Sequence, residues 1–487
     1  MLAGDILLEI FDFYLDEDVD ENIGQASSEK QRIEEWITLA HVCRRWRNVV
    51  FQSPLRLNLR LLCTHKSRAR DILDIWPAPL PLIIHKIDNN FDDESSNVDN
   101  IIAALEHNDR VCKIQLCWFS SSQFGYAKDS AAMQKPFPEL IDLQLGPYIH
   151  DGPVSKSTEP ILPDSFLGGT APHLRLLEFD GVQFPGLPKL LLSATHLVVL
   201  ALYNISPSGY VTPEVMTTSL SALTSLESLF LHFRYPRPRP APAGRRLLPT
   251  PLSRSILPSL TKIRFKGVSE YLEEILSRID APRLDELKII FFNQIIFDLP
   301  QLFQLISRRP TLSAPEKALV AFKYEAVIVK FPSQTSGYDV FTVKIRCTVP
   351  EWQLSSLEQV CTSFLPPVST LEDLYIFEAR EDPPRWQGDV ENTLWLDLLR
   401  SFAAVKNLYI SKEFVPRISP ALRELVEGSS TTTDVLLTLE KIFLEGFQTS
   451  EPLHEGIEKF VDARRLAGHP VALSRWDKGR LVITTVL

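Results

Sequence analysis

The chain has 487 residues, of which 45% are apolar, and a formal net charge of −10 with a sequence pI near 5.6. An acidic chain is not expected to bind nucleic-acid phosphates in general, because such binding needs a basic surface. The six cysteines contain no Cys-x-x-Cys pair, no apolar run approaches the ~20 residues that span a bilayer, and no signal-type apolar core stands at the start. We therefore expect an intracellular protein of the cytoplasm or nucleus, with no membrane partner and no nucleic-acid partner.

The first 54 residues show helical rather than alternating periodicity. One helix is predicted over residues 5–14 and a second over residues 36–50, with apolar residues at intervals of three and four in each. The acidic stretch 16–30 between them is interpreted as a solvated loop. Helices of this length are too small to form an independent core, so the segment is expected to need a partner.

Two parts of this segment resemble an F-box. They are Leu2-Ala-Gly-Asp-Ile-Leu-Leu-Glu-Ile-Phe11 and, after the insertion, Leu39-Ala-His-Val-Cys-Arg-Arg-Trp46-Arg-Asn-Val-Val-Phe51-Gln-Ser-Pro54. In that family the motif is a three-helix module that docks on the Skp-type adaptor of a cullin-RING ubiquitin ligase. Residues 55–63 and 70–77 further resemble F-box proteins that are abundant in mushroom-forming fungi. The family usually has Leu-Pro at the start, where this chain has Leu2-Ala3, and so lacks a residue preorganised for a helix start.

The resemblance implies a set of adaptor-facing residues. They are Leu2, Ile6, Leu7, Ile10, Phe11, Val42, Cys43, Trp46 and Val49. The alternative for the same residues is packing inside the module. We expect Phe11 and Trp46 to be partly internal, and Leu7, Ile10 and Val42 to point outward.

Residues 55–61 alternate leucine with polar residues, which predicts a strand that starts the following domain. From there a phrase recurs, Pro/Thr/Ser-x-Leu-x-x-Leu/Ile-x-apolar. Clear copies begin at Pro138, Pro172, Thr195, Thr224, Pro258, Pro282 and Ser369, and looser copies at Val111, Val405 and Leu439. Spacings of 23–24, 29 and 34 residues return along the series, and periods in this range point to a solenoid.

The repeats resemble leucine-rich repeats. The last two apolar positions of the phrase alternate as in a short strand, while segments such as 271–279 and 395–402 have helical periodicity. Each unit is then a strand, a turn, a helix and a return, and the strands are expected to form one curved, mostly parallel sheet. The Asn or Cys of the usual leucine-rich consensus is missing after the last apolar position, so we expect an irregular solenoid.

The predicted organisation is α/β, with three parts. A helical F-box module occupies 1–54, an irregular leucine-rich-repeat-like solenoid 55–467, and a C-terminal cap or tail 468–487. Within the solenoid, 235–251 is a Pro/Arg-rich stretch, interpreted as a projecting loop or a docking site for a partner or an acidic degron. The β-rich stretch 318–347 indicates a hairpin, either an inserted flap or two degenerate repeats.

Motifs for catalysis are lacking in the sequence. It contains no phosphate-binding Gly-rich loop, no His-Glu-x-x-His motif and no Gly-x-Ser-x-Gly elbow. We therefore expect no catalytic residues, no metal site and no cofactor, and a hydrolase built on the repeat frame is the least favoured of three hypotheses.

The resemblance favours a substrate-recognition subunit of a cullin-RING (SCF-type) ubiquitin ligase, with the Skp-type adaptor, and through it a cullin scaffold, as partners. The alternative is a protein-interaction scaffold with a degenerate F-box. Outward strand positions are the candidates for binding the target protein. They are Glu178, Tyr203, Glu227, Arg264 and Lys288.

Overall fold

The computed structural model describes residues 3–477 apart from several gaps. The gaps are 16–35, 54–55, 58, 65–68, 76–79, 86–97, 120–130, 148–159, 235–253, 293–296, 314, 333–338, 348, 350–351, 365–370, 380–382, 385–391, 428–434 and 448–452. The acidic stretch 16–30 and the Pro/Arg-rich stretch 235–251 thus lie outside the described residues. The chain divides into two compact units, Met1–Leu229 and Phe230–Leu487.

The first unit begins with the predicted helices. These are α1 (Gly4–Leu15), a helix over residues 36–42, and α3 (Arg44–Gln52). The ring of Phe11 packs edge-on against Trp46 with centroids 4.8 Å apart, and the ring of Trp36 packs against Phe51 at 6.4 Å. These aromatic pairs form the small internal core of the helices.

A series of strands and helices follows in the first unit. In chain order they are β1 (Leu61–Thr64), α4 (Ala69–Ile75), β2 (Leu82–His85), α5 (Val98–Leu105), β3 (Val111–Phe119), η1 (Ala131–Gln134), β4 (Asp142–Pro147), η2 (Phe166–Gly169), β5 (Leu176–Asp180), α7 (Leu187–Ser193), β6 (Val199–Ile205), η3 (Pro207–Gly209) and α8 (Pro213–Leu220). Strands β1 to β6 pair in chain order, and every pair is parallel. The strand predicted over 55–61 is wrong: the chain turns at Arg56 and Leu57, and the strand begins only at Leu61. Leu57 and Leu59 are nevertheless buried, so their alternation reflects contact with the core and not strand pairing.

The recurring phrase has a definite structural role, which is a tight turn into each strand. The first Leu donates its backbone N–H to the carbonyl three residues earlier, as in Leu140 to Phe137 (3.3 Å) and Leu174 to Ala171 (3.3 Å). The Pro or Thr of the phrase therefore occupies the second position of a four-residue turn, where the fixed φ of proline is favourable. The first Leu of each clear copy in the first unit is completely buried, which explains why the clear copies all have leucine at this position.

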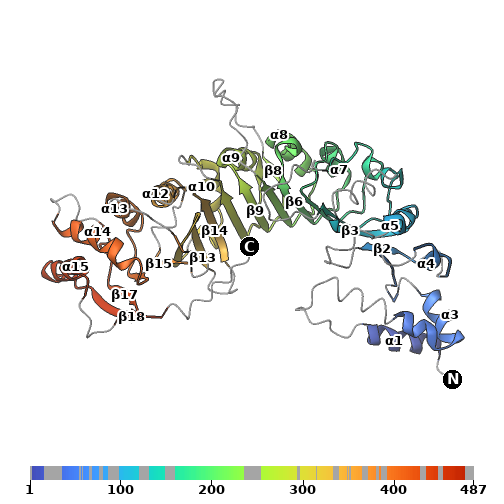
Figure 1. Ribbon diagram of the computed structural model, residues 1–487, viewed down its shortest axis with the longest axis horizontal. Helices are drawn as coiled ribbons and strands as arrows, with labels where there is room; N and C mark the ends of the chain where they lie inside the picture. Colours follow the sequence, from blue (N-terminus) through green and yellow to red (C-terminus); the bar gives the residue numbers. More distant parts are fainter. Residues whose placement is uncertain are drawn as a thin grey trace. The chain divides into compact units, whose positions relative to one another are not determined.

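The second unit contains the longer series of elements. In chain order they are β8 (Ser255–Ile256), β9 (Lys262–Gly267), α9 (Ser269–Arg278), β10 (Ile279–Asp280), β11 (Glu286–Phe291), α10 (Pro300–Ser307), α11 (Pro310–Ser313), β12 (Lys317–Lys323), β13 (Ala326–Pro332), β14 (Asp339–Arg346), α12 (Trp352–Phe364), β15 (Asp373–Glu378), α13 (Asn392–Arg400), β16 (Asn407–Ile410), α14 (Val415–Glu427), β17 (Lys441–Glu445), α15 (Glu455–Leu466) and β18 (Ala472–Trp476). Strand β7 (Ser228–Phe233) spans the boundary between the units. Apart from α1 and α3, the helices labelled in each unit lie along one face of the sheet (Figure 1).

The strand order in the second unit is β9-β11-β14-β13-β12-β15-β16-β17-β18. Pairing is parallel except at β12–β13 and β13–β14, which are antiparallel. The predicted hairpin is therefore present as β13 and β14, but residues 318–330 form two strands with a turn at Tyr324 and Glu325. Because β14 pairs with β11 and β12 with β15, the three strands are part of the main sheet and not a separate flap. At the other end β18 pairs with β17, so part of the predicted cap closes the sheet.

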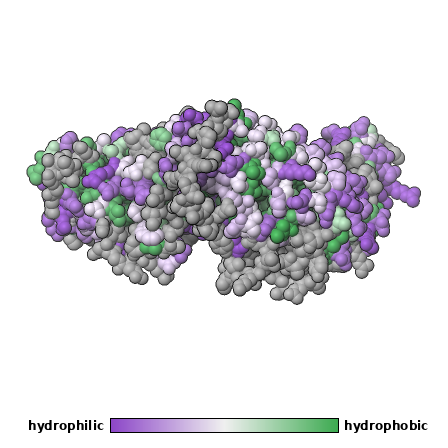
Figure 2. Space-filling model, turned by 90° about the horizontal axis from the view of Figure 1, so that it is seen from above, coloured by the Kyte–Doolittle hydropathy of each residue, from purple (hydrophilic) through white to green (hydrophobic). Residues whose placement is uncertain are grey.

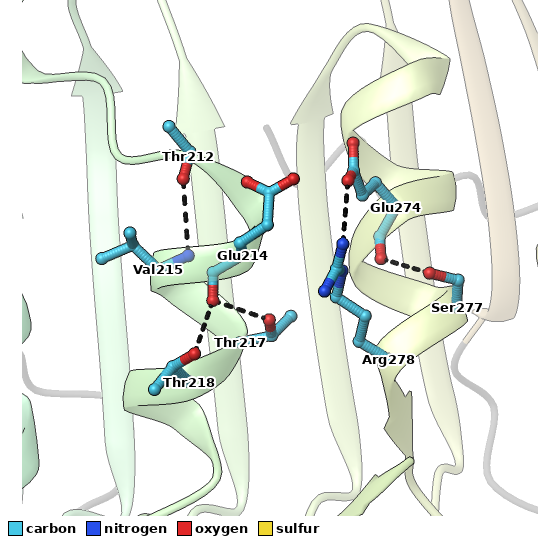
Figure 3. Close-up of polar contacts among 8 residues, drawn as sticks. All are labelled: Thr212, Glu214, Val215, Thr217, Thr218, Glu274, Ser277 and Arg278. Carbon is cyan, nitrogen blue, oxygen red and sulfur yellow. Dashed lines mark hydrogen bonds and ion pairs between the residues drawn. The ribbon is translucent and has the colours of Figure 1, made fainter. Parts of the chain in front are cut away.

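The helices are held by local hydrogen bonds as well as by core contacts. At the start of α8, Thr212 accepts a hydrogen bond from the backbone N–H of Val215 (3.4 Å), which satisfies a donor that the helix leaves unpaired (Figure 3). In α9, Arg278 forms an ion pair with Glu274 one turn earlier (3.2 Å). The predicted helical segments 271–279 and 395–402 correspond to α9 and α13, whose apolar faces are buried. The fold is thus α/β, an irregular solenoid with a mostly parallel sheet.

Candidate protein-interaction surfaces

The N-terminal helices leave a group of large apolar side chains exposed, which we call the N-terminal apolar surface. It consists of Ile6 (49% exposed), Ile10 (46%), Phe13 (76%) and Tyr14 (46%) on α1, and Val42 (55%). Spacings of three and four residues place the four side chains of α1 on one face of the helix. Large exposed apolar side chains grouped on one helix face are typical of a surface that binds another protein.

The residues predicted to face an adaptor are divided by the structure. Ile10 and Val42 are exposed, as expected, and Phe11, which was expected to be partly internal, is completely buried. The outward orientation predicted for Leu7 is wrong, since only 3% of it is exposed and it is buried as Phe11 is. Phe13 was missed, although its place three residues after Ile10 was visible in the helical spacing of the sequence.

The remaining predicted residues have mixed roles. Ile6 is exposed, whereas Trp46 and Val49 are half-buried. Cys43 is exposed and precedes α3, where its Sγ accepts a hydrogen bond from the N–H of Trp46 (3.5 Å). Leu2 lies outside the described residues.

The face of each sheet opposite the helices, which we call the open face, carries the side chains that alternate with the core positions. In the first unit, Asp142, Glu178 and Asp180 lie on neighbouring strands of this face. Burial, together with the nearby Asp180 and Asp142, raises the pKa of the Glu178 carboxyl. Lys113 partly offsets this charge through its ion pair with Asp142 (3.3 Å). This part of the open face is acidic.

The predicted target-binding residues Glu178, Tyr203 and Glu227 belong to the first unit. Tyr203 is opposite Asp180 in the register of β5 and β6, and Glu178 is opposite Ala201. Glu227 precedes β7, and its backbone N–H bonds to the carbonyl of Val198 (2.8 Å). Their role in binding stays a prediction.

Arg264 and Lys288, the other two predicted residues, are brought together by the second unit. Both contact the carboxylate of Glu286, Arg264 at 2.9 Å and Lys288 at 3.0 Å, and Lys262 approaches it at 3.8 Å. Although burial raises the pKa of Glu286, the hydrogen bonds from Lys288 and Arg264 outweigh it, and the pKa lies below its ordinary value. One carboxylate therefore forms ion pairs with three cations.

This arrangement belongs to a wider cluster on the open face of β9, β11, β13 and β14, which we call the basic strands. Its cations are Lys262, Arg264, Lys266, Lys288, Lys330, Lys344 and Arg346. The carboxylates at the described positions of the same strands are Glu286 and Asp339, the latter paired with Lys330 (2.8 Å). Burial and the positive charges of Lys266 and Arg264 lower the pKa of the neighbouring His232 to about 4, so this imidazole is neutral at physiological pH.

A row of stacked aromatic rings crosses the open face of β15, β16 and β17, and we call it the aromatic ladder. Tyr375 stacks on Tyr409 with centroids 4.0 Å apart, and Tyr409 stacks on Phe443 at 4.3 Å. Trp476 packs edge-on against Tyr409 at 5.7 Å, and its Nε1 donates to the carbonyl of Ile410 (3.0 Å). The three stacked rings are half-buried. The outward orientation of these rings follows from the sequence, because each ring stands between the last two apolar positions of its repeat.

One serine–histidine pair has the composition of a catalytic dyad. The Ser419 Oγ lies 2.5 Å from His454 Nδ1. Ser419 is completely buried between α14 and α15, however, and cannot meet a substrate there, so the contact joins the two helices. Among the residues that the structure describes, no group of three or more His, Cys, Asp or Glu is placed to hold a metal ion.

The described helices include none that is both long enough and apolar enough to cross a membrane. On the face shown in Figure 2, hydrophobic residues occur in small groups among hydrophilic ones.

Comparison with known proteins places few constraints on the chain. No family model and no curated protein matches it. Among solved structures it is similar to the leucine-rich repeat-containing protein LegL7 from Legionella pneumophila, with 10% sequence identity and a TM-score of 0.23. The alignment covers 84% of this chain and 98% of that one. The strands, turns and helices of the chain itself show the leucine-rich-repeat-like character of the fold.

Proposed function

We propose that this chain is the substrate-recognition subunit of a cullin-RING (SCF-type) ubiquitin ligase. In this proposal the N-terminal helices bind a Skp-type adaptor and the solenoid binds the target protein. The N-terminal apolar surface carries the proposal, because a small helical module with this much exposed apolar area is stabilised by a partner. The resemblance of residues 2–54 to an F-box, in the form abundant in mushroom-forming fungi, supports the identity of that partner.

The absence of the usual proline does not prevent the first helix from forming. The carbonyl of Ala3 accepts a hydrogen bond from the N–H of Leu7 (3.2 Å), which is the first bond of α1. Alanine favours helix as strongly as any residue. The loss of the proline at Ala3 is the main support for a degenerate F-box that no longer binds an adaptor. Since the helix forms without the proline, this hypothesis is the second candidate.

The function would be performed by tethering. The Nε1 of Trp36 donates to the carbonyl of Arg60 (3.0 Å), and Arg56 forms an ion pair with Glu9, so the N-terminal helices are joined to the start of the first repeat. A target held on the solenoid would then stay near the ligase components that transfer ubiquitin, which raises its effective concentration there. The chain itself would supply binding and no bond-making chemistry.

The test is a binding titration of the full chain against a purified Skp-type adaptor. The variant Ile10→Asp/Phe13→Asp places two charges in the N-terminal apolar surface without entering the core, since both side chains are exposed. Truncating one hot-spot side chain costs about 2 kcal/mol or more, which is roughly thirtyfold in affinity, so we expect the two substitutions together to lower the affinity by at least about a hundredfold. A matched control is Leu466→Asp, which introduces a charge at an 86% exposed position on α15 and should bind as wild type does.

Failure of the folded wild type to bind the adaptor at micromolar concentration would reject the ligase proposal and leave the interaction scaffold. Equal binding by Ile10→Asp/Phe13→Asp would show that the adaptor binds elsewhere.

A further inference from the structure

The open face of the second unit combines two chemically different regions at a fixed separation. The basic strands lie on β9, β11, β14 and β13, and the aromatic ladder lies on β15, β16 and β17, in one continuous strand order. Adjacent strands are ~4.8 Å apart. From β11, which carries Lys288, to β16, which carries Tyr409, there are five strand intervals, or ~24 Å by that spacing.

The basic strands carry a positive charge, although the chain as a whole is acidic. The net charge of the whole chain is −10, yet on these strands lysines and arginines outnumber carboxylates, and Glu286 alone contacts three cations. Such a region attracts negatively charged ligands. The hydroxyl of Thr342 lies in register between Lys288 and Lys330 and has no hydrogen-bond partner in the part of the chain described. Its oxygen is buried, so the contacts with a ligand are assigned to the cations alone.

The aromatic ladder offers a different kind of contact. Half-buried, stacked rings present rigid apolar area at a low cost in side-chain entropy, which is why Tyr and Trp are frequent at protein interfaces. A buried apolar cluster, against which Tyr375 packs, is formed by Leu319 and Ala321 on β12 with Ile328 on β13 and Phe377 on β15. Because these four side chains are buried, a ligand would make its contacts at the two ends and only cross the cluster.

We infer that the open face of the second unit binds an extended, acidic peptide segment whose carboxylates contact the basic strands and whose aromatic or aliphatic side chains contact the ladder. An extended chain advances ~3.3 Å per residue, so ~24 Å corresponds to about seven residues between the two anchors. The inference rests on the proposed role of the solenoid in binding a target, and it adds the chemical class of the target segment and its spacing. A nucleic acid would match the basic strands, but the strands of the ladder carry the carboxylates Asp373 and Glu445 beside Lys441, and these oppose a continuous phosphate backbone.

The test uses the full chain and a fluorescein-labelled peptide with two glutamates, a spacer of six serines and glycines, and two phenylalanines. We expect saturable binding that weakens with added salt, at least tenfold weaker binding by Arg264→Gln/Lys288→Gln, and at least fivefold weaker binding by Tyr409→Ala. The control Arg400→Gln removes one positive charge from an exposed helix position and should leave the affinity unchanged. Circular dichroism melting of each variant shows that it is folded.

Two further probes examine the geometry and the class of ligand. A peptide without the spacer reaches only one of the two anchors. Its affinity for the wild type should therefore be no higher than the affinity of the spaced peptide for Arg264→Gln/Lys288→Gln. The inference is overturned if spacing has no effect, if the folded variants bind as wild type does, or if a single-stranded oligonucleotide of equal charge binds as tightly. It is also overturned if the peptide binds only after residues 478–487 are removed, because that result would mean that those residues compete with the peptide. Adaptor binding by the same protein is measured separately, so loss of peptide binding alone leaves the proposed ligase function standing.

Discussion

Replacing Gly456 by alanine sets two effects of opposite sign against each other. Gly456 is the second residue of α15, and alanine is favoured over glycine in a helix by about 1 kcal/mol. A Cβ built on Gly456, however, would lie 2.3 Å from the carbonyl oxygen of Ser419 and 2.5 Å from its hydroxyl oxygen. Neither backbone nor a fully buried side chain can move aside easily, so α14 and α15 would have to separate.

Overpacking of this kind costs about 1–3 kcal/mol, and separation would also break the contact between Ser419 and His454. We expect Gly456→Ala to lower the free energy of unfolding by about 1–3 kcal/mol net, and to increase the rate of amide exchange in α14 and α15. Urea denaturation and peptide-resolved hydrogen–deuterium exchange measure these quantities. The control is Gly4→Ala, where a Cβ meets no atom within 4 Å and stability should not fall. If Gly456→Ala were as stable as wild type, the close approach of the two helices would be incorrect.

Three other predictions concern the repeats, one buried carboxyl and the attachment of the N-terminal helices. Leu174→Ala should cost about 2–5 kcal/mol of stability, because this residue is completely buried at the turn into β5, while Leu192→Ala at a 51% exposed position should cost little in the same urea titration. Burial raises the pKa of the Glu273 carboxyl to about 7 despite hydrogen bonds from the backbone N–H groups of Gln301 and Leu302. The folded state therefore holds this proton more tightly than the unfolded state. The contribution of Glu273 to stability should fall as pH rises from about 4.5 to about 7. The variant Glu273→Gln should remove this decrease from the pH dependence of the melting temperature. Trp36→Phe deletes the hydrogen bond to the carbonyl of Arg60 and should speed proteolysis between the helices and β1 without changing the melting of the second unit; unchanged proteolysis would mean that this bond does not hold the helices in place.

The repeat architecture could be predicted because its signal is local. Each phrase specifies a turn, a buried Leu and an alternating strand, and these features depend on residues next to one another in the sequence. The hairpin at β13 and β14 was visible for the same reason. Its insertion between β11 and β15 was not, because strand order depends on pairings between segments far apart in the chain.

The interaction surfaces show where local patterns are insufficient. Leu7 and Ile10 have the same apolar character and helical spacing, but Leu7 is buried and Ile10 is exposed. Which of them faces outward is decided by the packing of Phe11 on Trp46, a contact between helices that sequence periodicity does not contain. Likewise Tyr409 was visible as an outward strand position, but its stacking on rings of the neighbouring strands follows from their register.

The central claim, that the N-terminal helices bind an adaptor while the solenoid remains available for a target, is tested most directly by hydrogen–deuterium exchange of the full chain with and without a Skp-type adaptor. The account predicts that the adaptor slows exchange in α1 and in residues 36–52 and leaves β15, β16 and β17 unchanged. Unchanged exchange in α1 under saturating adaptor, or protection confined to the second unit, would contradict it.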